Sequence, residues 1–174
     1  DSGVAINLIS YHFKTKDELL EAVLERHAAR ITAMRQDQLG QLELRHSPGV
    51  PPVREIMAAL IGPVFRLKEE DPTLWASFLG LLARERGSAA WSATIGHRVS
   101  AMLRQHAVLL HRALPSASRS ALTGAVTVAF LSVLLSSPLE ARALIGPDLE
   151  GWEEASLEGL LVDMMTAAAM SLAR

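Results

Sequence analysis

The strongest constraint on the fold is a helix-capping sequence followed by a long run of apolar residues at helical spacing. Thr15 and Glu18 form a capping box, in which each side chain accepts a free backbone N–H at the start of a helix. The segment RHSPGVPP, at 45–52, ends the run with glycine and proline. The sequence therefore predicts a helix of roughly eight turns that begins at about Lys16. Its apolar face consists of Leu20, Val23, Leu24, Ile31 and Met34.

Similar start and stop signals divide the rest of the chain into further helices. Asp71 and Pro72 are typical of a helix start, and Gly87 and Pro115 are typical of helix ends. No segment shows the alternation of a strand, so the fold class is all-α without internal repeats. The expected helices span 53 to about 69, 72 to about 87, 88 to 114, about 118 to 136, and about 151 to the end.

Composition limits the possible functions. Of the 174 residues, 49% are hydrophobic and 21% are charged, which is typical of a globular chain. The absence of cysteine excludes disulfides, zinc-thiolate sites and thiol catalysis. The start shows no signal peptide, so we expect a cytoplasmic protein. The net charge is −2, with six Lys or Arg against seven Asp or Glu before His46 and eleven against twelve after it, and this balance counts against nucleic-acid binding.

One uncharged segment, 120–139, is long enough to span a membrane. Its many Ser, Thr and Gly residues are unfavourable for contact with lipid. We therefore expect a buried helix and no membrane partner, with Ala121, Ala125 and Ala129 forming a ridge of small residues that another helix can approach closely.

The segment before the long helix carries a family resemblance. Gly3 can form a tight turn, and residues 5–11 can form a short helix. This order, with Gly3-Val4, Tyr11-His12-Phe13, Lys16 and Leu19-Leu20 in place, resembles the TetR family of bacterial transcription repressors, in the branch whose recognition helix ends in Tyr-His-Phe. The motif covers Ser2 to Ala22, and elsewhere the resemblance depends on helix order and length. Family members carry two helices before this motif, so we expect part of the DNA-binding domain to precede Asp1.

The resemblance implies that the short helix lies in the major groove of a palindromic double-stranded operator. Asn7 could bind adenine through two hydrogen bonds, and Lys16 could meet a phosphate at the start of the long helix. The expected DNA-binding residues are Ile6, Asn7, Leu8, Ser10, Tyr11, His12 and Lys16. The alternative interpretation is a surface turn whose Tyr11 and His12 rings lie against the core.

The same resemblance implies two domains. Residues 1–45 would contain the C-terminal part of the helix-turn-helix domain and the connecting helix, and residues 46–174 would bind the effector and form the dimer. We expect a small, largely apolar or amphipathic effector that releases the protein from its operator. The predicted ligand-binding residues are Phe65, Trp75, Phe78, Leu82, Met102, His106 and Phe130, with Arg66, Arg84, Gln105 or His106 available for a polar head. Core packing explains the apolar members of this set equally well.

The two C-terminal helices are the most apolar, and we expect them to pair with their symmetry mates in a four-helix bundle. The predicted interface residues are Ala125, Ala129, Leu134, Leu157, Leu161 and Met165. Asp163 should lie at the edge of this interface or pair with a Thr or Arg, because an unpaired buried carboxylate is costly. The alternative is that both helices are buried within one monomer.

Metal binding and catalysis find little support in the sequence. No two histidines have the four-residue spacing that places both on one metal, and His106 and His111 are five apart. No nucleophile motif or phosphate loop is present, so we expect no cofactor, no metal and no enzymatic activity. The leading hypothesis is a homodimeric, ligand-responsive repressor of TetR type. The alternative hypothesis is a helical small-molecule-binding or dimerisation module without a role on DNA.

Overall fold

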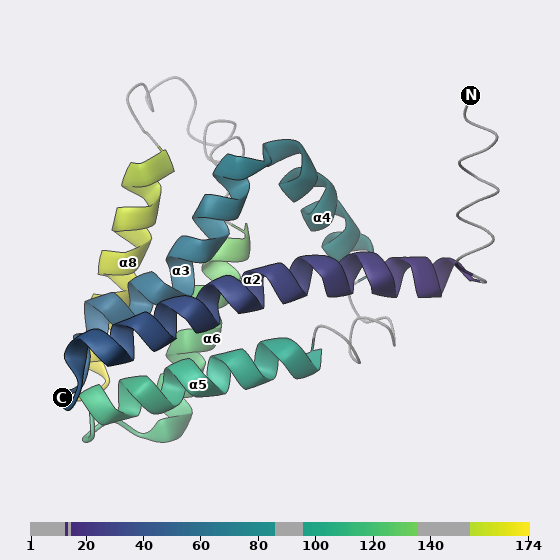
Figure 1. Cartoon of the computed structure of the whole chain (residues 1–174). Helices are drawn as coiled ribbons and strands as arrows, with labels where there is room; N and C mark the ends of the chain where they lie inside the picture. The colour runs from purple at the N-terminus through teal and green to yellow at the C-terminus, as the bar shows by residue number, and fades with distance from the viewer. Residues whose placement is uncertain (1–12, 14, 86–95, 136–153) are drawn as a thin grey trace.

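The computed structural model describes residue 13 and residues 15–85, 96–135 and 154–174. Within these ranges all regular structure is helical, which confirms the all-α fold class (Figure 1). The helices are α2 (Lys16–His46), α3 (Val53–Glu70), α4 (Pro72–Glu85), α5 (His97–Ala113), α6 (Arg119–Leu135) and α8 (Glu154–Ser171). The short helix expected at 5–11 and the expected helical residues at 86–95, 136 and 151–153 lie outside the described residues.

The described helix ends agree with the capping signals in the sequence. The hydroxyl of Thr15 accepts the backbone N–H of Glu18 at 3.1 Å, so the Thr half of the predicted capping box is confirmed. Pro72 is the first residue of α4. Proline suits this position because an N–H here would have no hydrogen-bond partner within the helix. The hydroxyl of Ser118 accepts the N–H of Ala121 at 3.2 Å and caps α6. These ends are predictable because each depends on residues within one turn.

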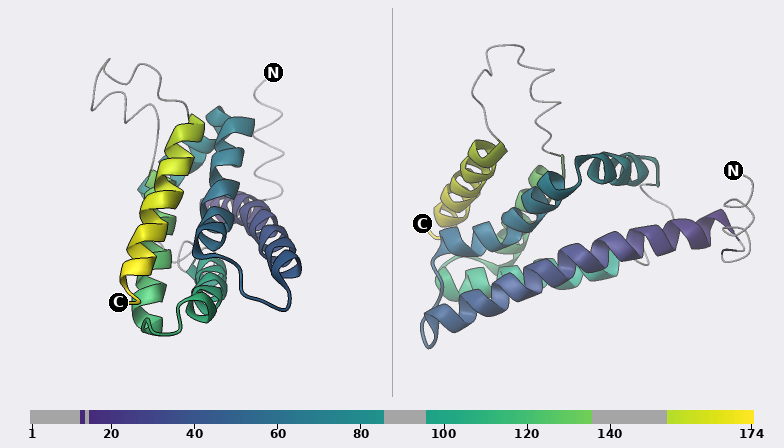
Figure 2. Two further views of the ribbon diagram at one scale, coloured as in Figure 1. Left: turned by 90° about the vertical axis from the view of Figure 1, so that its left-hand side faces the viewer. Right: turned by 45° about the horizontal axis from the view of Figure 1, so that its top comes forward.

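Helix α3 forms the centre of the molecule and packs against α2, α5, α6, α8 and α4. Helices α2 and α5 lie side by side on one flank, and α6 and α8 lie together on the other (Figures 1 and 2). Because α3 is covered by helices on most sides, its middle part, residues 56–65, is apolar and buried except for the half-buried Ala58. Its fully buried residues include Ile56, Leu60, Ile61, Val64 and Phe65.

Pro63 lies in the interior of α3 and changes the hydrogen bonding toward α2. Because proline has no N–H, the carbonyl of Ala59 loses its partner within the helix, and α3 bends along its length (Figure 2). In the orientation that satisfies both of its polar atoms, the Gln38 amide donates to Ala59 at 3.2 Å and accepts from Arg66. The bend therefore gives α2 a backbone carbonyl to bind.

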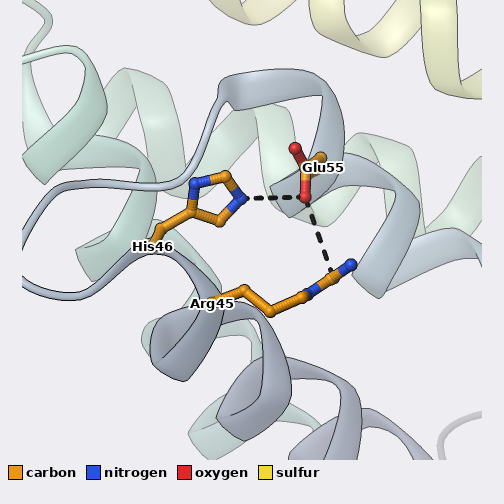
Figure 3. A network of polar contacts seen from close by, with 3 residues as sticks. All are labelled: Arg45, His46 and Glu55. Carbon is orange, nitrogen blue, oxygen red and sulfur yellow. Dashed lines mark hydrogen bonds and ion pairs between the residues drawn. The ribbon is translucent and has the colours of Figure 1, made fainter.

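The C-terminal end of α2 is held to the body by ion pairs. Glu55, in the first turn of α3, lies 3.0 Å from Nε2 of His46 and 3.7 Å from Nη2 of Arg45 (Figure 3). Arg112 of α5 donates to Glu43 at 2.9 Å. At the other end, the first turns of α2 project beyond α5 (Figures 1 and 2). Helix α2 is thus fixed at its C-terminal end and extends from the body toward the N-terminus.

Helix α8 is joined to α3 by an ion pair at the surface. Nε of Arg54 donates to Oδ1 of Asp163 at 2.8 Å. This confirms the expectation that Asp163 would pair with an arginine or threonine. As for the membrane alternative, no described helix is both long enough and apolar enough to cross a bilayer.

Candidate ligand-binding cavity

A cavity of about 230 Å³ lies where α2, α5 and α6 meet Phe78 of α4. Each helix contributes residues at helical spacing, such as Ile31 and Arg35 on α2 and Phe130 and Leu134 on α6, so one face of each helix is directed to it. Most of the lining is apolar. The lining residues are Ile31, Thr32, Arg35, Phe78, Gly96, Val99, Ser100, Met102, Leu103, Thr127, Phe130, Leu131 and Leu134.

The only charged residue among those that line this cavity is Arg35, which is 2% exposed. Its Nε donates to the carbonyl of Leu60 at 2.9 Å, and its Nη1 lies 3.0 Å from the sulfur of Met102. The guanidinium carbon lies 5.0 Å from the centre of the Phe130 ring, a cation–π contact. Nη2 is buried and has no hydrogen-bond partner among the described residues.

Within the described residues, Arg35 is therefore a buried cation without a counter-charge. Burial lowers the pKa of Arg35 from 12.5 to about 9. Because this pKa still lies well above neutrality, the guanidinium remains charged at pH 7. No carboxylate of the described residues forms an ion pair with it, and a thioether sulfur is a weak acceptor. The cavity thus contains a positive charge whose hydrogen-bonding capacity is only partly used.

His106 lies behind the cavity wall and is 0% exposed, so it belongs to the core and not to the lining of the cavity. Its Nδ1 lies 2.9 Å from the carbonyl of Met102, which requires that Nδ1 carry the proton. Burial lowers the pKa of His106 from 6.5 to about 4, and the charge of Arg35 adds to the effect. His106 is therefore neutral at pH 7 and supplies no second charge to the cavity.

The structure divides the predicted ligand-binding residues into two groups. Phe78, Met102 and Phe130 line the cavity. Phe65 and Trp75 are buried elsewhere, around Lys68, whose Nζ lies 4.8 and 5.6 Å from their ring centres. Leu82 belongs to α4, but its side chain is outside the described part of the chain.

Two of the candidates for a polar contact, Arg66 and Gln105, lie outside the cavity. Arg66 is exposed and contacts Gln38, Gln105 lines a separate groove between α2 and α5, and the side chain of Arg84 is not among those described. Arg35 was not selected from the sequence. Its position four residues after Ile31 and four before Leu39, both buried, is the signal that could have identified it.

Two further hollows are larger but less suited to an apolar ligand. The groove between α2 and α5 has a volume of about 570 Å³ and includes Arg104 and the ion-paired Glu43 and Arg112. A hollow of about 390 Å³ includes Arg45, Glu55 and Arg66. At least half of the residues that line each of these hollows are polar or charged, whereas most of the residues that line the cavity at Arg35 are apolar and buried or half-buried. No cluster of three potential metal ligands occurs in the described ranges.

Most of the predicted DNA-binding residues lie outside the described residues: Ile6, Asn7, Leu8, Ser10, Tyr11 and His12. Lys16 is the first residue of α2, although its side chain is not described. Helix α2 is continuous from Lys16 to the cavity-lining Arg35 and beyond. One continuous helix therefore connects the cavity with the start of α2.

The predicted interface residues occupy two environments. Ala129 and Leu134 are buried within the protomer, and Leu134 lines the cavity. Ala125, Leu157, Leu161 and Met165 are half-buried. Val128 and Leu131 of α6 and Leu160 and Met164 of α8 are exposed apolar residues, and we call these four together the α6–α8 face; Leu131 also lines the cavity. Along each helix, the exposed residues of this face occur on the side opposite the buried residues, as expected for a helix that is covered on one side.

Comparison with known proteins gives one match. Residues 58–169, more than half of the chain, match the family model described as "Tetracyclin repressor-like, C-terminal domain". No curated protein and no solved structure matches the chain.

Proposed function

Because the chain belongs to the tetracyclin repressor-like family, we propose that it is a ligand-responsive, DNA-binding transcription repressor of TetR type. The observation that carries this proposal is the placement of the cavity on α2, the helix that also continues toward the segment resembling a recognition helix. A ligand in the cavity would contact α2 directly. A ligand-responsive regulator needs such a connection between its ligand site and its DNA-binding segment, whereas an enzyme does not.

In this proposal, residues 1–45 belong to the DNA-binding part and its connecting helix, and residues 46–174 belong to the effector-binding and dimerisation part. The second half of α2 is shared between them, because Leu39 and Leu42 are buried in the helical body. Ile6, Asn7, Leu8, Ser10, Tyr11, His12 and Lys16 contact a palindromic operator. The repressor acts in the cytoplasm, where its operator DNA is found.

Release of the operator follows from the mechanics of α2. Its C-terminal end is held by the ion pairs of Glu55 and Glu43, so a ligand that displaces α2 at Arg35 changes the position of its projecting N-terminal end. In a dimer, two such ends must match two operator half-sites about 34–36 Å apart, or multiples of that distance. A small change in the direction of α2 would then lower operator affinity.

Dimerisation through the α6–α8 face completes the proposal. Its four large apolar residues are exposed in the single chain, where contact with water is unfavourable. A symmetric pairing of α6 and α8 would bury them in a four-helix bundle. Ala125, Leu157, Leu161 and Met165, which lie half-buried beside the face, would join the interface at its edges.

A second function has support in the charge balance. The net charge of −2 favours a helical binding or dimerisation module that does not contact DNA. Gel shifts of the full-length protein with the DNA upstream of its own gene distinguish the two functions. We expect a shifted band at low salt that weakens strongly as salt rises, because phosphate contacts release counterions. If no band shifts at low salt, the regulator proposal is wrong.

A further inference from the structure

We propose that the cavity binds an anionic ligand with one carboxylate and an apolar body, and that Arg35 binds the carboxylate. The role of this ligand as an effector rests on the proposed function, but its binding does not. The inference starts from a charge that has no counter-charge among the described residues. A buried guanidinium is costly unless it is paired, and proteins pair such groups with carboxylates or phosphates.

The contacts of Arg35 show which end of the side chain is available to a ligand. Nε is engaged with the carbonyl of Leu60 on α3, away from the lining residues. Nη1 and the guanidinium plane meet Met102 and Phe130, both of which line the cavity. The side of the guanidinium that carries Nη1 and Nη2 is therefore directed to the cavity.

A carboxylate fits this side of the guanidinium. Nη1 and Nη2 can donate in parallel to its two oxygens, which is the strong bidentate arrangement of arginine with a carboxylate. The ligand would replace the sulfur of Met102, a weak acceptor on a flexible side chain. Thr32 lines the cavity one helical turn before Arg35 and offers a hydroxyl on the same face of α2.

The charge and lining of the cavity limit the rest of the ligand. Arg35 supplies one positive charge and His106 is neutral, so the cavity can neutralise the charge of a monoanion but not both charges of a dianion. Ile31, Phe78, Leu103 and Leu131 form apolar walls that suit an alkyl or aryl group. The volume of about 230 Å³ is below the roughly 300–1,000 Å³ of pockets for drug-sized ligands. A medium-chain fatty acid and a small aryl carboxylate share this chemistry.

The test compares acids with their neutral amides by titration calorimetry on the full-length protein. The probes are octanoate and octanamide for the alkyl class, and phenylacetate and phenylacetamide for the aryl class. We expect at least one acid to bind about tenfold or more tighter than its amide, since charge-assisted hydrogen bonds are about twice as strong as neutral ones. The pair that shows the preference identifies the class of the apolar body.

Arg35→Met keeps the length of the side chain and removes its charge. In this variant the acid should lose its advantage and bind no better than the amide, while the far-ultraviolet spectrum and thermal midpoint show that the protein is folded. Arg104→Met is the matched control, because Arg104 is exposed and lines the separate groove between α2 and α5. This control should retain the preference for the acid.

The inference is overturned if wild-type protein binds neither acid, if it binds acid and amide equally, or if Arg35→Met keeps the preference. Its failure is separable from that of the proposed function. A protein that shifts operator DNA but binds no carboxylate remains a regulator with a different effector. A protein that binds the acid through Arg35 but shifts no DNA keeps the site and loses the regulatory role.

Discussion

At the scale of single residues, Arg35 and His106 are buried polar groups that an apolar core would not need. Arg35 lines the cavity and His106 lies behind its wall, and burial lowers the pKa of each because it disfavours the charged form. The sequence predicts His106 as a possible contact for a polar head of the ligand. Arg35 was missed because an arginine on a long amphipathic helix is normally exposed. Its spacing from Ile31 and Leu39 places it on their face of α2, but the burial of that face depends on α3 and α5.

The charge of Arg35 should destabilise the ligand-free protein. We expect Arg35→Met to be neutral or to raise the free energy of unfolding, because an unpaired buried charge is costly whereas an apolar side chain of similar length is not. Urea unfolding of the ligand-free protein at pH 7 measures this. If Arg35→Met instead lowers the free energy of unfolding by more than about 2 kcal/mol, the contacts of Arg35 stabilise the fold, because destabilisations of that size result from the loss of buried interactions.

His106 should make stability depend on pH. Its pKa is about 4 in the folded protein and 6.5 as the ordinary value, so the unfolded chain binds more protons between these pH values. The stability is fully present above about pH 6.5 and falls as pH drops toward about 4, by on the order of 3 kcal/mol from this group. In His106→Gln the change between pH 7 and pH 4.5 should be smaller. An equal change in both proteins would contradict the pKa of His106.

At the scale of elements, sequence and structure agree on the helix starts at Lys16, Val53 and Pro72 and, within one residue, at Arg119. Caps, prolines and glycines act within one turn, so Thr15, Pro72 and Ser118 are sufficient to predict their helix starts. The cavity could not be predicted in the same way, because α2, α5 and α6 form it only when packed around α3. Phe78, Met102 and Phe130 line the cavity, whereas Phe65 and Trp75 are buried around Lys68, and ligand binding by these residues remains a prediction.

Helix α2 provides a test of which face packs on the body. Leu42 is 1% exposed, whereas Leu44, two residues later, is 79% exposed. We expect Leu42→Ala to lower the free energy of unfolding by about 2–5 kcal/mol, because it removes buried methyl groups and leaves a void. Leu44→Ala is the matched control and should change stability by less than about 0.5 kcal/mol. Similar effects of both substitutions in urea unfolding would mean that α2 packs through another face.

At the scale of the whole molecule, the described part of a single chain has a helical body, a projecting α2 and an apolar α6–α8 face (Figure 1). The expected pairing of C-terminal helices remains a prediction. The sequence could indicate that α6 and α8 are apolar, but it could not separate residues that face the protomer's own core from those that face outward. Ala129 and Leu134 belong to the first group, and Val128 and Met164 belong to the second.

The α6–α8 face can be tested by charge. Val128 and Met164 are 54% and 53% exposed in the protomer, so Val128→Arg or Met164→Arg should leave the fold intact and convert a dimer into a monomer. Val108→Arg is the matched control, because Val108 is 63% exposed on α5, outside this face. Sedimentation at micromolar concentration measures the state. A wild-type monomer, or variants that remain dimeric, would contradict the proposed interface.

The central claim is that a ligand at Arg35 controls DNA binding through α2, and operator affinity with and without ligand tests it most directly. Fluorescence anisotropy of labelled operator would be measured for the full-length protein and for Arg35→Met, each with and without the acid that binds. We predict that the acid weakens wild-type binding by roughly 5- to 150-fold, the usual range of such coupling, and leaves the variant unaffected. Equal operator affinity of the wild type with and without saturating acid would contradict the account.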